Sequence, residues 1–125
     1  MKSLTGPIQY ERSTTNMAQP EVPEGITHAH QYCSQLGITD ANALLVVKIA
    51  RNCSKLKLDA DHSPRAVVAG IVMAVIRNRE LKITVTDVLW VAMVSEVSIN
   101  SMCRIILPFY DILIDDEATN HMVRR

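Results

Sequence analysis

The chain has 125 residues, with 13 basic and 13 acidic side chains and a formal net charge of zero. This length allows one domain, and the balanced charge argues against a strong nucleic-acid-binding footprint over the whole surface. Aromatic residues make up only 4% of the sequence, so the core must be built from aliphatic residues, alanine and methionine. Such a core is typical of packed helices rather than of a sheet.

Residues 1–21 show no apolar periodicity and contain the turn-forming residues Gly6, Pro7 and Pro20. This pattern predicts a linker or an extended arm. The segment has no continuous apolar stretch, so no signal peptide is predicted.

Two amphipathic helices are predicted next. The first covers residues 24–36, with Gly37 as the residue that ends it. The second covers residues 40–56, with Thr39 or Asp40 as its N-cap. One stripe of the second helix is polar and is predicted to face solvent: Lys48, Arg51, Asn52 and Lys55. The opposite stripe is apolar and is predicted to be buried: Ala43, Val46, Val47, Ala50 and Cys53.

Eleven consecutive apolar residues, Ala66–Ile76, follow directly behind Ser63 and Pro64. Ser is a favoured N-cap and Pro a favoured first helical residue, so a helix is predicted from Ser63 to about Asn78. A helix that is apolar all round must be buried on every side, and eleven residues are too few to span a bilayer. We therefore predict a central helix enclosed by its neighbours, with Gly70 allowing one of them to approach closely.

A fourth helix is predicted to start at Thr84, because Thr84 and Asp87 have the spacing of a capping box. It runs to Ala92, and the helical pattern breaks at Met93 and Val94.

Ser95 then caps a fifth helix that extends to about Leu107 and is ended by Pro108. The predicted fold class is all-α, with five helices, an enclosed third helix, and a helix-turn-helix formed by the last two. Residues 111–125 form an acidic tail, whose pattern is compatible with a further helical turn or with irregular structure.

The three cysteines lie far apart within apolar helical patterns, which predicts reduced, buried thiols. Trp90 is predicted to lie in the core. Core positions are also predicted for six sulfur-containing side chains: Cys33, Cys53, Cys103, Met73, Met93 and Met102.

The fifth helix has two distinct faces. One side is apolar and is predicted to anchor the helix to the core: Ile99, Met102, Cys103 and Ile106. The opposite side carries candidates for reading base edges, since the second helix of a helix-turn-helix enters the major groove. Val97 would contact a thymine methyl, Asn100 would pair with adenine, and Ser101 would bond to bases or backbone.

Phosphate contacts are predicted for Ser95 at the helix N-terminus and for Arg104 further along the same helix. Lys82 and Arg79, before the fourth helix, are two further candidates. Both lie in a central region, residues 41–82, that holds eight basic and three acidic side chains. The alternative interpretation is an ordinary polar helix face, because helix-turn-helix geometry recurs without DNA binding.

No catalytic residue, metal site or cofactor is predicted. His28 and His30 are two positions apart, so they point away from each other on a helix. No nucleophile has a base at motif spacing, and the chain is therefore not expected to be an enzyme.

The motifs from Ser63 to Ile106, taken in order, resemble the second cyclin-type repeat of general transcription factor IIB. In that family a Ser-Pro pair opens an Ala-rich buried helix, as in SPRAVVAGIVMAVI here. A Thr-x-x-Glu cap, then Asp-Val-Thr-Ile-Arg and Tyr-Arg-Leu-Ile follow in the family, where this sequence has TVTD, EVSIN and CRII. HQYCSQLGI and VVKIARNCSKL resemble the first two helices, so the resemblance covers about residues 22–107.

The resemblance implies a cyclin-like domain over residues 22–110 that acts in transcription initiation in the nucleus. It implies promoter DNA, the TATA-binding protein and, through a full-length factor, RNA polymerase II as partners, and no membrane. The family's base-reading Arg is Asn100 here and its turn Gly is Met93, while Val97 is retained. The family's zinc ribbon and first repeat have no counterpart, so the sequence is expected to be a fragment or a reduced paralogue.

A cyclin-like module that docks a kinase or a transcription factor without touching DNA is the alternative. The neutral overall charge favours this module. The helix-turn-helix pattern and the central basic excess favour DNA.

Overall fold

A computed structural model describes residues 24–124, in which every regular element is a helix. The predicted arm, residues 1–21, lies outside the described residues. The helices are α1 (Glu24–Leu36), α2 (Asp40–Lys55), α3 (Pro64–Arg79), α4 (Val85–Ala92), α5 (Glu96–Ile106), the 3-10 helix η1 (Leu107–Phe109), α6 (Tyr110–Leu113) and α7 (Asp116–Arg124). The all-α prediction is confirmed.

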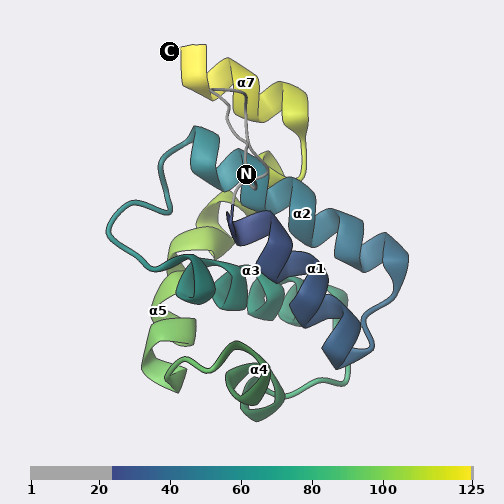
Figure 1. Ribbon diagram of the computed structural model, residues 1–125. Helices are drawn as coiled ribbons and strands as arrows, with labels where there is room; N and C mark the ends of the chain where they lie inside the picture. The colour runs from purple at the N-terminus through teal and green to yellow at the C-terminus, as the bar shows by residue number, and fades with distance from the viewer. Residues whose placement is uncertain (1–23, 125) are drawn as a thin grey trace, which may run out of the picture.

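Helix α3 lies at the centre of the molecule, with α1, α2, α4 and α5 packed against it (Figure 1). Every residue of the run Ala66–Ile76 is buried. The prediction of an enclosed third helix is therefore confirmed, because an apolar surface on all sides of a helix is covered only when neighbours surround it.

Local capping defines where the helices begin and end. The Ala66 N–H donates to Ser63 Oγ at 3.2 Å, and both hydrogen bonds of the Thr84–Asp87 capping box are present. Gly37 has a φ of 71° and ends α1 in the left-handed conformation that glycine adopts without strain. Thr39 occupies the N-cap position of α2, but its side chain makes no capping hydrogen bond.

The chain stays helical after Pro108, so the five-helix prediction is incomplete. Pro108 interrupts the α5 hydrogen-bond pattern and sits at the start of the short 3-10 helix, where its missing N–H is tolerated. Asp115 then opens α7, because its Oδ1 accepts hydrogen bonds from the N–H groups of Glu117 (2.9 Å) and Ala118 (3.2 Å). Helix α7 packs against α2 and α6.

Two residues expected in the core are exposed. Trp90 has 74% of its surface exposed, because α4 is buried through Val88 and Ala92, which lie on the side of the helix away from Trp90. Met93 is 76% exposed because it ends α4 in the left-handed conformation, with a φ of 58°. Met73 and Met102 are buried as predicted.

The three cysteine thiols are buried and form no disulfide, as predicted. Burial raises the pKa of the Cys33 thiol to about 11 and that of the Cys53 thiol to about 12. Both thiols are therefore protonated at neutral pH and act as small apolar core groups.

Gly70 is the point where α3 and α5 touch. A Cβ placed on Gly70 would lie 2.5 Å from the Met102 Cβ and 3.1 Å from the Cys103 nitrogen. The close approach predicted at this glycine is confirmed, and the partner helix is α5.

We expect Gly70→Ala and Gly70→Leu to destabilise the protein, the larger substitution by about 1–3 kcal/mol or more, because α5 must move away from α3. Gly25→Ala is the matched control, since its Cβ would lie 3.4 Å from Val68 Cγ2, an ordinary contact. Urea denaturation measures the free energy of unfolding of the Gly70 variants and of the control. A Gly70→Leu protein as stable as the wild type would contradict the close packing.

Candidate nucleic-acid interface

Helices α4 and α5 have the geometry of a helix-turn-helix. The helix axis changes direction by 108° between Val85–Ala92 and the stretch Glu96–Leu113, within the 90–120° typical of this motif. Within the described residues, no single helix is long and apolar enough to cross a membrane, although this bent pair together reaches that length and composition. The turn between the two helices is Met93–Ser95.

Met93 makes the turn in a backbone conformation that residues other than glycine rarely adopt. Its N–H donates to the Leu89 carbonyl at 2.8 Å, and its φ of 58° lies in the left-handed region. A residue with a Cβ is strained there, by about 1–2 kcal/mol relative to the right-handed helix. The Met93 side chain offsets little of this strain through burial, because it is largely exposed.

Helix α5 starts at Ser95, as predicted. The Ser98 N–H donates to Ser95 Oγ at 3.1 Å, and the Ser95 hydroxyl donates to the Ser98 hydroxyl at 3.0 Å. The phosphate contact predicted for Ser95 is not tested by this geometry, but its hydroxyl already serves as the N-cap.

The buried face of α5 is the predicted one, because four residues are fully buried: Ile99, Met102, Cys103 and Ile106. On the other side, Val97 is 75% exposed and Arg104 is exposed. Asn100 and Ser101 are half-buried and lie at the edges of this outer face. Their roles in base reading stay predictions.

Arg77, from the last turn of α3, reaches across to α5. Its Nη2 donates to Asn100 Oδ1 at 3.4 Å, and its Nη1 donates to Cys103 Sγ at 3.8 Å. This contact of Arg77 could not be predicted from the sequence, since no local spacing joins positions that are 23 residues apart.

Arg79 and Lys82 are the two other basic residues predicted to contact phosphate; Arg79 lies near α6 and Lys82 near α4, and their roles stay predictions. Arg79 is close to Tyr110 of α6, where it partly opposes the rise in the Tyr110 pKa that burial causes. Lys82 lines a hollow together with Leu36 of α1 and Trp90 of α4.

The basic residues of α2 lie beside α7 rather than beside α5. Lys48, Arg51 and Lys55 line a hollow with Asp116 and Asn120, and α2 and α7 occupy the end of the molecule opposite α4 (Figure 1). The central basic excess of the sequence is thus divided between separate regions of the surface.

Asn52, predicted to face solvent, is fully buried. Its Nδ2 donates to the Leu113 carbonyl at 2.8 Å and to Asp116 Oδ1 at 2.9 Å, so it joins α2 to α6 and α7. The Asn52 hydrogen bond lowers the pKa of the Asp116 carboxyl, and the positive charges of Lys48, Lys55 and Arg51 act in the same direction against an opposing effect of desolvation.

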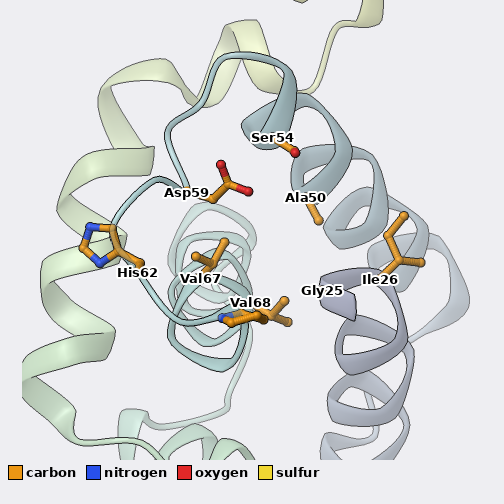
Figure 2. A pocket seen from close by; sticks show the side chains of 9 residues that line it. Gly25, Ile26, Ala50, Ser54, Asp59, His62, Val67 and Val68 are labelled. Atoms are coloured by element: carbon orange, nitrogen blue, oxygen red, sulfur yellow. The ribbon is translucent and has the colours of Figure 1, made fainter. Parts of the chain in front are cut away.

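A separate hollow of about 170 Å³ lies between α1, α2 and the start of α3 (Figure 2). Its lining is largely apolar, with Ser54, Asp59 and His62 as the side chains that carry polar groups. Figure 2 shows His62 on the side of the hollow away from Ser54. In the described part of the chain, no three His, Cys, Asp or Glu side chains gather in a way that could hold a metal ion.

The sequence matches a protein of Acanthamoeba polyphaga mimivirus described as a "Putative transcription initiation factor IIB-like protein". The two are 29% identical over 98 residues, which is 78% of this chain. The chain is distantly similar to a transcription factor IIB-like protein. It spans only 21% of the length of that relative. No family model matches the chain, and no solved structure matches it.

We expect Met93→Gly to raise the free energy of unfolding by about 0.5–1 kcal/mol, because glycine adopts the left-handed conformation without strain. Thr86→Gly, at an exposed position in the same helix with ordinary helical backbone, is the control and should not stabilise. Thermal and urea denaturation report both changes. Equal behaviour of the two variants would mean that the turn carries no strain.

We expect Asn52→Ala to lower the free energy of unfolding by about 1–3 kcal/mol, because it leaves the Leu113 carbonyl without its partner. Lys55→Ala removes only an exposed hydrogen bond to Asn120 and should change stability by less than about 0.5 kcal/mol. Amide hydrogen exchange in α7 should accelerate in Asn52→Ala alone. Unchanged exchange would show that Asn52 does not hold α7.

Proposed function

We propose that this chain is a non-enzymatic transcription initiation factor domain of the transcription factor IIB type, which binds promoter DNA through α4 and α5. The observation that carries the proposal is the 108° helix-turn-helix, whose second helix buries one face and presents Val97 and Arg104 on the other. The distant similarity to a transcription factor IIB-like protein supports the same role.

In this proposal the N-terminal turns of α5 enter the major groove. Val97 lies in the first turn and is free to contact a thymine methyl. The first N–H groups of the helix favour a phosphate, and Arg104, farther along, contacts the backbone. The phosphate contacts positioned in this way orient the helix, and the base contacts give sequence preference.

We further propose that the fold is cyclin-like, which the enclosure of α3 by four helices supports. The proposed partners are the TATA-binding protein and, within a larger factor, RNA polymerase II, with the nucleus as the place of action. Because the chain corresponds to a fifth of its relative, these partners belong to the proposal for a longer assembly.

A protein-interaction module that does not contact DNA is the second candidate. The observation that favours it is the exposure of two large apolar side chains, Trp90 in the last turn of α4 and Met93 directly after the helix. Large exposed apolar side chains of these types are enriched at protein interfaces.

Salt dependence of duplex binding tests the proposal. If the 125-residue chain binds through phosphates, its affinity should fall steeply between 50 and 200 mM salt. Arg104→Ala should reduce the slope of log affinity against log salt concentration by about one. It should weaken binding to all DNA sequences alike. Val97→Ala is the matched variant: it should leave the slope unchanged and alter preference at a single base pair.

The measurements are made with and without the TATA-binding protein, and urea denaturation confirms that each variant is folded. Salt-independent binding, or no binding even on a complex of DNA with the TATA-binding protein, would contradict the proposal. Loss of binding to a protein partner in Trp90→Ala would then favour the interaction module.

A further inference from the structure

The outer side of α4 and the turn that follows it present two large apolar side chains to solvent. Trp90 is 74% exposed, and Met93, three positions later, is 76% exposed. Single apolar side chains on a surface are ordinary, but Trp and Met are enriched at protein interfaces, where Trp often dominates the binding energy. This side of α4 is therefore a candidate contact surface for another protein molecule.

An open hollow of about 420 Å³ lies directly beside Trp90, within the size range of pockets that hold small ligands. It is formed by the end of α1, the residues that precede α4, and α4 itself. Its apolar lining is half-buried and consists of Leu36, Ile83 and Val91. Its charged lining is exposed and consists of Lys82 and Asp87. The surface thus combines a projecting aromatic ring with an apolar recess next to it.

We propose that two copies of this chain form a two-fold symmetric dimer through this surface, with Trp90 of each copy in the hollow of the other. The inference goes beyond the proposed function, because it involves α4 rather than the outer face of α5 and requires no DNA.

The surface is chemically complementary to itself. In a two-fold symmetric contact the same patch of both copies meets, so each contact between one residue and another occurs twice. A projecting ring beside a recess satisfies this requirement, since each ring meets the other copy's recess. Lys82 and Asp87 satisfy it as well, because each positive side chain can face the negative side chain of the other copy.

The distribution of charge favours a second copy over a strongly acidic or basic partner. A partner of one charge sign needs a surface of the opposite sign, whereas Lys82 and Asp87 cancel each other here. The whole chain has a formal net charge of zero, so two copies approach each other without long-range repulsion.

Trp90 is the one tryptophan of the sequence, so its fluorescence reports on this surface alone. The 125-residue chain, without DNA, is measured from about 1 to 100 μM, because dimer formation depends on concentration. The mass found by sedimentation should rise from one chain to two. The Trp90 emission should shift to shorter wavelength in parallel, since the ring leaves water.

Trp90→Ala should weaken the dimer by about tenfold or more, because it removes the group that fills the hollow. Leu44→Ala is the matched control: Leu44 is 65% exposed on α2, outside this surface, and its loss should leave the dimer unchanged.

A charge exchange tests the two-fold arrangement itself. Lys82→Glu would bring acidic side chains together across the dimer and Asp87→Lys basic ones, so each variant alone should associate about tenfold more weakly. A mixture of the two variants pairs opposite charges at both contacts and should restore association. Asp87 also accepts the Thr84 N–H in the capping box, so urea denaturation is used to confirm that Asp87→Lys is folded.

A chain that stays monomeric with the emission of an exposed ring would overturn the inference. Short-wavelength emission from a monomer would also overturn it, because another part of the same chain would then cover the ring. A dimer that Trp90→Ala leaves intact, or a mixture of the charge variants that does not associate, would exclude this surface as the two-fold contact. These measurements contain no DNA, so their failure leaves the proposed function to the salt dependence of duplex binding.

Discussion

The contact between α3 and α5 at Gly70 is the constraint on which the rest of the structure depends. Without a side chain at this position, the Met102 side chain and the Cys103 backbone come within a distance that any Cβ would block. This approach buries one face of α5 completely and closes the last side of the apolar helix α3. Interiors packed to this density transmit small displacements, so the orientation of α5 follows from the absence of one methyl group.

The same contact determines what α5 can present to a ligand. Four residues of the helix are committed to the core, and the turn at Met93 directs α5 away from α4 by 108°. The outer face that remains is narrow, with Val97 and Arg104 exposed and Asn100 at its edge. Because the end of α3 lies against this edge, Arg77 becomes part of the surface although it belongs to another helix.

Charge is distributed locally in a chain whose net charge is zero. On α2, three basic residues lie beside Asp116 of α7, and the buried Asn52 amide links the two helices. On the other side of the molecule, Arg77 donates hydrogen bonds to neutral groups of α5, the Cys103 sulfur and the Asn100 oxygen. One acidic side chain of α7, Asp116, thus lies beside the three basic side chains of α2.

The sequence by itself determined where α3, α4 and α5 begin and which helix is enclosed. Ser63, Thr84 and Ser95 act on N–H groups within three residues, so their capping role is visible in any four-residue window. The burial of α3 was equally predictable, because a helix without a polar side has no face to offer to water. The buried face of α5 followed from its spacing alone.

Only the tertiary structure decided the exposure of side chains whose surroundings come from distant parts of the chain. Asn52 is buried by Leu113 and Asp116, more than sixty residues away. Trp90 is exposed because α4 is short and packs through its other face, which composition does not reveal. The pairing of Arg77 with Asn100 likewise arises when two helices cross. Helical periodicity reports which residues share a face, whereas the partner that covers or completes that face is set by packing between helices.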